Sequence, residues 1–196
     1  YNSHIPNLLR ISGHLWAQRY LGLDEQNCFT ALYGIWSPDD LLKLLQWGGP
    51  KLHPIAAREY AGWQKLQGLS QRLGNVYEQI SGSPLREPLL LSDRPLSIVA
   101  AAVDPDHEAQ WNHWYTESHV PNLLKVPVYV LAGRFRVLEH PALAGWNTGP
   151  KYLALYEIES EEVLPSLQLG DSMNSAARAE LNRWQEFGIP HVTNFS

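Results

Sequence analysis

An internal repeat limits this chain to folds that can be built twice from one unit. The stretch Ser-His-Ile-Pro-Asn-Leu-Leu-Arg-Ile at residues 3–11 returns as Ser-His-Val-Pro-Asn-Leu-Leu-Lys-Val at residues 118–126. Residues 31–35, Ala-Leu-Tyr-Gly-Ile, return as Ala-Leu-Tyr-Glu-Ile at residues 154–158. The copies lie more than a hundred residues apart, whereas solenoid repeats span about 20–50 residues. Each copy is therefore a domain-sized unit, and the chain is a fused pseudo-dimer.

A third match supports the division of the chain into two repeats. Ala-Ala-Arg at residues 56–58 returns at residues 176–178, in the same order relative to the other matches. Pro, Ser and Leu dominate the stretch between the copies, and this change of composition marks a linker. The predicted boundaries are a first repeat over 1–80, a linker over 81–94 and a second repeat over 95–196.

The two copies differ at their beginnings. A strand-and-helix segment precedes the second motif at residues 118–126, whereas the chain opens on Tyr1, directly ahead of the first motif and without an initiator Met. We therefore expect residues to be missing before Tyr1. The first repeat is expected to lack its opening strand and most of its first helix.

Composition and charge exclude several kinds of partner. The 196 residues have a net charge of −5 and contain no Lys/Arg run, so no nucleic-acid groove is expected. No apolar run reaches the roughly 20 residues of a membrane span. The single cysteine, Cys28, cannot form an intrachain disulfide and is typical of a reducing compartment, so we predict a cytoplasmic protein. The expected partner is a small molecule, and homodimerisation stays open.

The second repeat shows its elements most clearly. Residues 96–103 form an apolar, β-branched run typical of a strand, and Asp104 followed by Pro105 predicts a helix start. That helix runs toward His119, and Pro121 either kinks or ends it. The other elements predicted for this repeat are strands at 128–137 and 151–158, a helix at 174–187 and a last strand near His191.

The first repeat follows the same order from its second strand onward. Its predicted elements are strands at 12–21, 28–36 and 75–80, with helical pieces between residues 38 and 73. The order β-α-β-β-α-β is that of the ferredoxin-like unit. Its sheet carries helices on one face and leaves an apolar face that must be covered. We therefore predict an α+β protein in which two tandem ferredoxin-like units pack sheet to sheet as a barrel-like pair.

One motif resembles a known signature. The segment Trp114-Tyr115-Thr116-Glu117-Ser118-His119-Val120-Pro121 is similar to the W-Y-x-x-x-H-x-P pattern of EthD-like members of the dimeric α+β barrel superfamily, and Ser3-His4-Ile5-Pro6 is its shorter match. The resemblance implies that the two copies form an intramolecular dimeric α+β barrel. Such members include cofactor-free lactone isomerases, polyketide cyclases and quinone-forming monooxygenases, together with heme proteins and stress-associated proteins.

Four residues are candidates for catalysis: His119, His4, Tyr115 and Arg134. Histidine exchanges protons near neutrality because its ordinary pKa is about 6.5. The alternative is that each histidine only bonds a backbone carbonyl near the following proline. Tyr115 either donates a hydrogen bond to an oxyanion or belongs to the core.

Two arginines and several tryptophans are candidates for substrate binding. Arg19 and Arg134 occupy matching strand positions, where each either pairs with a carboxylate or holds a substrate anion. Flat aromatic walls suit an aromatic ligand through offset stacking, although tryptophan also serves as core. The predicted substrate-binding residues are Trp111, Trp114, Arg19, Trp16 and Trp146.

No metal or organic cofactor is predicted. His113 and His119 face different sides of a helix, and the chain has neither an H-x-x-x-H pair nor a cysteine cluster. A metal could still be assembled from distant residues, with Glu117 and His119 joined by His14 or His53. Heme is less favoured because no Met or Cys axial candidate stands out.

The sequence predicts a cofactor-independent acid–base enzyme, that is, a lyase, isomerase, cyclase or dehydratase acting on a small aromatic or polyketide-like molecule. Two alternatives stay open, a non-catalytic module that binds a hydrophobic ligand or assembles with a partner, and a metal-dependent lyase or oxygenase. The second repeat keeps the Trp114-Tyr115 pair ahead of its histidine, so it is expected to dominate catalysis.

Overall fold

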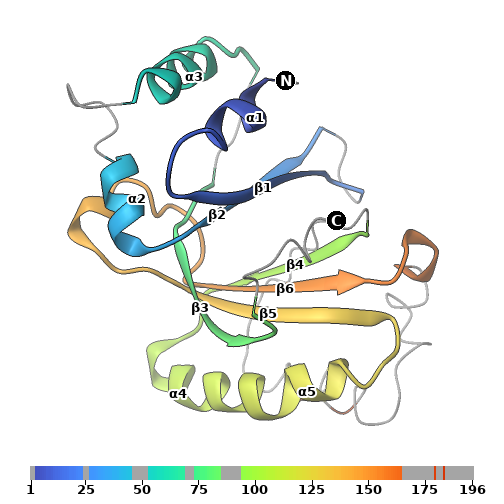
Figure 1. Ribbon diagram of the computed structural model, residues 1–196. Helices are drawn as coiled ribbons and strands as arrows, with labels where there is room; N and C mark the ends of the chain where they lie inside the picture. The colour runs from blue at the N-terminus through green and yellow to red at the C-terminus, as the bar shows by residue number, and fades with distance from the viewer. Residues whose placement is uncertain are drawn as a thin grey trace.

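Two antiparallel sheets organise this α+β chain in the computed structural model, which describes residues 3–23, 27–45, 53–68, 73–84 and 94–164 together with Ala179 and Arg183 (Figure 1). One sheet pairs β1 with β2, and the other has the order β3-β5-β6-β4. The strands are β1 (His14–Leu21), β2 (Phe29–Ile35), β3 (Tyr77–Gly82), β4 (Leu96–Ala101), β5 (Tyr129–Val137) and β6 (Tyr152–Ile158). These bounds confirm the six strands predicted within the described ranges.

Helices cover the outer faces of the sheets. Figure 1 shows α1 and α3 above β1–β2, and α4 and α5 below the four-stranded sheet. The helical elements are α1 (His4–Leu8), α2 (Pro38–Leu45), α3 (Pro54–Gln64), α4 (Pro105–Trp114), the π-helical turn η2 (Tyr115–His119), α5 (Val120–Leu123) and the short 3₁₀ helices η3 (Pro141–Leu143) and η4 (Glu161–Val163). No helix in the described part of the chain is long and apolar enough to cross a membrane.

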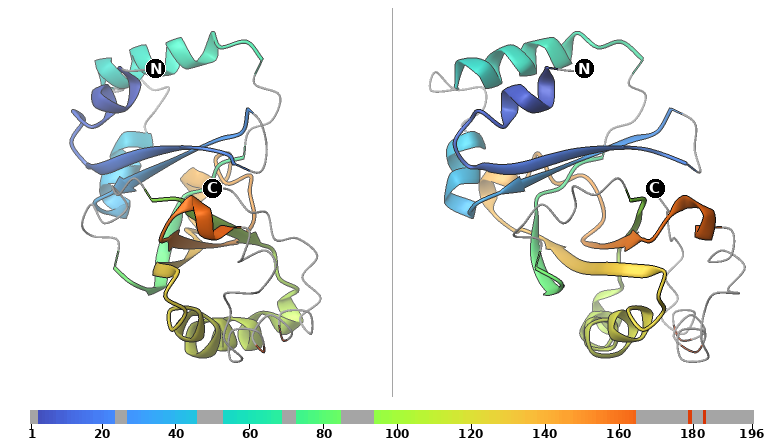
Figure 2. Two further views of the ribbon diagram at one scale, coloured as in Figure 1. Left: turned by 90° about the vertical axis from the view of Figure 1, so that its right-hand side faces the viewer. Right: turned by 45° about the vertical axis from the view of Figure 1, so that its right-hand side comes forward.

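The inner faces of the two sheets pack against each other (Figure 2). A buried cluster of Leu96, Ile98 and Leu155 from the four-stranded sheet contacts Trp16 and Leu32 from the other sheet. Successive side chains of a strand point to opposite faces, so this cluster takes alternate residues of each strand. The remaining alternate residues of β1, β2, β5 and β6 therefore lie on the outer faces, beside the helices.

β3 joins the two predicted repeats by backbone hydrogen bonds between strands. It belongs to the first predicted repeat, yet it pairs with β5 of the second, from Tyr77 opposite Val137 to Gly82 opposite Gly133. Gly82 has a φ of 92°, and an added Cβ would collide with the carbonyl oxygen of Ala132. The strand ends two residues later than predicted, because Ser81 and Gly82 resemble turn residues but take part in this pairing.

The helical segment of the second repeat widens before its proline. Asp104 caps α4 as predicted, since its Oδ1 accepts the Asp106 N–H at 2.9 Å. The helix passes through η2 before α5, which carries Pro121 in its first turn. In a regular α-helix the proline ring would collide with the carbonyl four residues earlier, at Glu117. The wider π turn accommodates the proline without ending the helical segment.

Two predicted elements lie outside the described residues. These are most of the helix at 174–187, of which only Ala179 and Arg183 are described, both helical, and the last strand near His191. The strand order β5-β6-β4 is therefore the described part of the second repeat's sheet.

Candidate functional site

The repeat places one histidine, one tyrosine and one arginine on the outer face of each sheet. The histidine comes from the repeated Ser-His motif, the tyrosine from the repeated Ala-Leu-Tyr and the arginine from the strand before it. We define the first site as His4, Tyr33 and Arg19, and the second site as His119, Tyr156 and Arg134.

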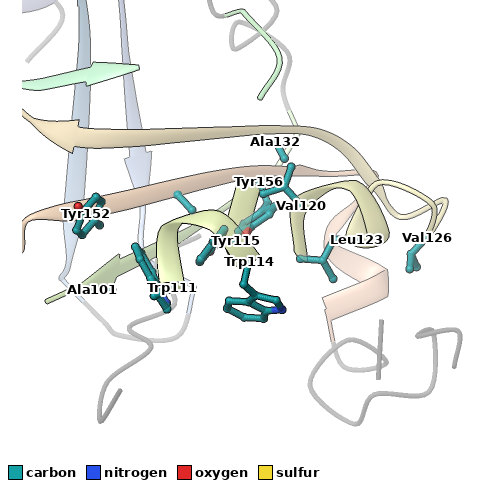
Figure 3. Close-up of a cluster of buried hydrophobic side chains, with 11 residues drawn as sticks. Ala101, Trp111, Trp114, Tyr115, Val120, Leu123, Val126, Ala132, Tyr152 and Tyr156 are labelled. Carbon is teal, nitrogen blue, oxygen red and sulfur yellow. Dashed lines mark hydrogen bonds between the residues drawn. The ribbon is translucent and has the colours of Figure 1, made fainter. Parts of the chain in front are cut away.

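The second site lies inside an aromatic core. Trp111 and Tyr115 are each 1% exposed, Trp114 is 3% exposed and His119 is 4% exposed. The His119 ring packs beside two of them, with its centroid 4.8 Å from Trp114 and 4.7 Å from Tyr115. Figure 3 shows the three aromatic side chains along the helical segment, with Tyr156 beside Tyr115. The structure thus brings the predicted helix residues together, as part of a hydrophobic core.

Arg134 is held in this core by neutral groups. Its guanidinium donates to the Asn112 carbonyl at 3.2 Å, to Asn112 Oδ1 at 2.7 Å and to Thr116 Oγ1 at 2.5 Å. It also lies 4.3 Å from the ring centroid of Tyr115 and 4.9 Å from that of Trp111. Burial lowers the pKa of Arg134. None of the described carboxylates forms an ion pair with it, so aromatic faces, the Asn112 oxygens and the Thr116 hydroxyl stabilise the cation.

Two tyrosines beside Arg134 bond each other through their hydroxyls. The Tyr115 and Tyr156 oxygens are 2.7 Å apart. Burial raises the pKa of Tyr115 to about 12 and that of Tyr156 well above its ordinary value, so both are neutral phenols at neutral pH. The crevice that Tyr115 and Arg134 line with Trp111 and Tyr152 is too narrow for a water molecule. Among the described residues, this crevice beside Arg134 therefore has no room for a ligand.

The first site contains a histidine–carboxylate pair. His4 Nδ1 lies 2.9 Å from Glu59 Oε2, and Glu59 Oε1 accepts from Asn7 Nδ2 at 2.6 Å. α1 and α3 hold the pair together, because Leu8 and Ala56 are buried against each other. The hydrogen bond from His4, followed by that from Asn7, lowers the pKa of Glu59 despite the opposing effect of burial. Since an ionised carboxylate only accepts, His4 Nδ1 carries the proton.

The other ring nitrogen of His4 faces the sheet. His4 Nε2 lies 3.5 Å from the Tyr33 hydroxyl, which is a long contact. Burial raises the pKa of Tyr33, and the charge of Arg19 opposes that shift only in part, so Tyr33 is a neutral donor. The His4 side chain is 35% exposed, whereas His119 is 4% exposed.

A β-bulge adds His14 to the first site. The pairing of β1 with β2 shifts by one residue between His14 and Trp16, which turns His14 toward Tyr33, with ring centroids 6.4 Å apart. The second repeat has a bulge at the matched place, where Tyr129 contacts Tyr156. Burial lowers the pKa of His14, so its imidazole is neutral at neutral pH.

The remaining predicted residues are Arg19, Trp16 and Trp146. Arg19 is exposed, with its guanidinium 4.2 Å over the Phe29 ring. Trp16 packs between the two sheets, on the opposite face of β1 from Arg19. Trp146 lies in the connection between β5 and β6, where its backbone N–H bonds the Leu143 carbonyl.

Four residues of the two sites were not predicted from the sequence. Tyr33 and Tyr156 are the third residues of the repeated Ala-Leu-Tyr, a signal that was present in the repeat itself. Glu59 follows the matched Arg58, whereas Ala179 follows Arg178, so the repeat also shows that only the first copy has this carboxylate. Asn112, which bonds Arg134, has no such signal in the chain.

The described residues contain no cluster of potential metal ligands. Within residues 3–23, 27–45, 53–68, 73–84 and 94–164, no group of three or more His, Cys, Asp or Glu side chains is arranged to hold a metal ion. The metal site considered from the sequence, with Glu117, His119 and His14 or His53 as ligands, is therefore not formed by these described residues.

Comparison with known proteins gives one partial match. Residues 96–186, just under half of the chain and all within the second predicted repeat, match the family model of a domain of unknown function, DUF4286. No curated protein and no solved structure matches the chain.

Proposed function

We propose that the chain is a cofactor-independent acid–base enzyme of the lyase or isomerase type, acting on a small aromatic or polyketide-like molecule. His4 is its acid–base residue. One observation carries this assignment: the 2.9 Å pair of His4 Nδ1 with Glu59, on a histidine whose side chain is 35% exposed. A base oriented by a second group and open on its other nitrogen is the arrangement that proton transfer requires.

The geometry supports a simple route for the proton. His4 Nε2 accepts a proton from a substrate carbon beside a carbonyl, and the electron pair moves onto the carbonyl oxygen. The Tyr33 hydroxyl donates a hydrogen bond to that oxygen, and Glu59 stabilises the imidazolium. Protonated His4 then returns the proton to another carbon in an isomerase, or to the leaving group in a lyase.

The surroundings of His4 support an aromatic substrate. Tyr33 and His14 present two rings in an edge-to-face arrangement beside it. A planar ligand gains from offset stacking on such surfaces. The neutral state of His14 avoids a second positive charge beside the imidazolium that forms during the reaction.

The second site has a structural role in this proposal. His119, Trp114, Tyr115 and Arg134 lie in a closed core, where their hydrogen bonds and ring contacts join the helical segment to the sheet. The proposal therefore assigns the chemistry to the first repeat, the reverse of the expectation drawn from the longer aromatic motif of the second.

The fold proposal is a tandem pair of ferredoxin-like units, as the EthD-like resemblance implies. Three observations support it: the order β4, α4, β5, β6 along the second repeat, the sheet order β5-β6-β4, and the apolar contact between the inner faces of the two sheets. Pairing of β3 with β5 supports a closed, intramolecular arrangement.

Solvent deuterium exchange tests the function. The chain is incubated in D₂O with a panel of lactones and aromatic ketones, and deuterium incorporation at carbon is followed by NMR. We expect catalysed exchange that falls by about 10²–10⁴-fold in His4→Ala. The control is His107→Ala, which removes an exposed histidine on α4. Exchange at the wild-type rate in His4→Ala, or none by the wild-type chain, would contradict the proposal.

A further inference from the structure

The repeated Ser-His motif ends on an asparagine that has different partners in the two repeats. In the first repeat, Asn7 lies one turn after His4 on α1, so the two side chains share a face of the helix. In the second repeat, Asn122 stands at the same place after His119. Only the first of these asparagines lies beside a carboxylate that its histidine also contacts.

Asn7 and His4 hold the two oxygens of one carboxylate. Asn7 Nδ2 donates to Glu59 Oε1 at 2.6 Å, while Glu59 Oε2 lies 2.9 Å from His4 Nδ1. An ionised carboxylate only accepts hydrogen bonds, so the amide nitrogen of Asn7 and not its oxygen faces Glu59. Two donors from a single turn of α1 therefore fix the carboxylate at both ends.

This fixing matters because Glu59 comes from another helix. α3 packs on α1 through Ala56 and Leu8, an apolar contact that sets the distance between the helices but not the rotamer of a carboxylate. Arg58 also lies near Glu59 Oε1, at 3.6 Å, yet its side chain is 68% exposed, so it constrains the carboxylate little. The bond from Asn7 is the shorter and the less exposed of the two constraints on this oxygen.

The second repeat contains the same asparagine without the carboxylate. Asn122 Nδ2 donates to Ser118 Oγ at 3.4 Å, and Asn122 Oδ1 accepts from Lys125 Nζ at 2.8 Å, so both bonds lie within the repeated motif. Ala179 stands at the place of Glu59. Asn122 is therefore a matched comparison for Asn7 within the same chain.

We propose that Asn7 is a positioning residue of the first site, which acts through Glu59 to hold His4 in the tautomer that has its proton on Nδ1. The inference rests on the proposed function, in which His4 Nε2 takes the proton of the substrate. The bond from Asn7 favours the ionised form of Glu59, and an ionised carboxylate aimed at Nδ1 keeps the proton on that nitrogen. Nε2, beside the Tyr33 hydroxyl, is then the basic nitrogen.

Nitrogen NMR of the His4 ring, recorded without substrate, tests this tautomer directly. Asn7→Leu and Asn7→Ala both remove the amide donor, and the leucine variant keeps most of the side-chain volume. At a pH where the ring is neutral, we expect one Nδ1–H tautomer in the wild-type chain and a mixture of the two tautomers in both variants. Their turnover in the deuterium-exchange assay should fall by about tenfold or more, because the base is misaligned.

Asn122→Leu is the matched control. It removes the same amide from the same motif in the second repeat, so the His4 tautomer and the turnover should stay as in the wild-type chain, while urea denaturation confirms that each variant is folded. An unchanged Nδ1–H tautomer in both Asn7 variants, or equal mixing of tautomers in Asn122→Leu, would overturn the inference. Mixing confined to the Asn7 variants, in a chain whose wild type catalyses no exchange, would support the role of Asn7 in setting the tautomer and contradict the proposed function alone.

Discussion

The two repeats carry the same histidine, tyrosine and arginine at matched positions and surround them differently. The His4 side chain is 35% exposed and bonds Glu59, whereas His119 is 4% exposed and packs against Trp114 and Tyr115. Duplication copies side chains, and the elements packed around each copy determine their chemistry. A histidine that bonds a carboxylate in one copy is packed into the aromatic core in the other.

We expect the largest difference between the repeats in the free energy of unfolding when the matched arginines are replaced. Arg134→Ala removes three hydrogen bonds and leaves a gap between Trp111 and Tyr115, so it should lower the free energy of unfolding by about 3–5 kcal/mol. Arg19→Ala changes an exposed side chain and should cost less than about 1 kcal/mol. Urea denaturation measures both.

Arg134→Met sharpens that comparison. It keeps much of the side-chain volume while removing the charge and its donors. A loss as large as that of Arg134→Ala would assign the stabilisation to the hydrogen bonds rather than to packing. Equal losses from Arg134→Ala and Arg19→Ala would break the distinction between a closed and an open site.

Removing a tyrosine hydroxyl should lower the stability of the chain in the second site and lower its turnover in the first site. Tyr115→Phe leaves the buried Tyr156 hydroxyl without this 2.7 Å partner and should cost about 1–3 kcal/mol. Tyr33→Phe should change stability by less than about 0.5 kcal/mol, yet lower turnover by roughly 10²–10³-fold as an oxyanion donor is lost. Thermal unfolding and the deuterium-exchange assay give the two values. A stability loss at Tyr33 as large as that at Tyr115 would contradict the division.

The strands of the described residues and the start of α4 could be predicted from the sequence. Strand positions followed from alternation and from the duplicated motifs, and the Asp104 cap from its local pattern. The partner of β3 was not predictable in this way, because the residues of a strand specify which faces are apolar but not which sheet edge the strand joins. The π turn before Pro121 was likewise one of several ways to accommodate a proline.

The candidate site was predictable only in its repeated members. His4 and Arg19 were found because their copies at His119 and Arg134 attract attention. Glu59 lies 55 residues from His4, and only the packing of α1 on α3 brings them together. The exposure of the histidine was also not predictable, since the histidine of the matched motif is half-buried in the first repeat and buried in the second.

We expect the smallest effect in the pH dependence of the free energy of unfolding, through Glu59 of the first repeat. His4 and Asn7 lower the pKa of Glu59 below its ordinary 4.5, so this group stabilises the fold above the unfolded-state pKa. That contribution is lost as the pH falls through the lower, folded-state value, and it should be about 1 kcal/mol or less. The difference in unfolding free energy between the wild-type chain and Glu59→Gln should therefore shrink between pH 7 and pH 3. A difference that grows on acidification would contradict this sign.

The central claim is that His4 transfers protons and His119 holds the core. Its most direct test is the turnover of His4→Ala against that of His119→Ala, assayed side by side where urea denaturation shows both variants to be folded. We expect His4→Ala to lose about 10²–10⁴-fold in turnover, and His119→Ala to stay within several-fold of wild type while its unfolding free energy falls by about 2–4 kcal/mol. Loss of turnover in a stable His119→Ala variant, with His4→Ala still active, would contradict the account.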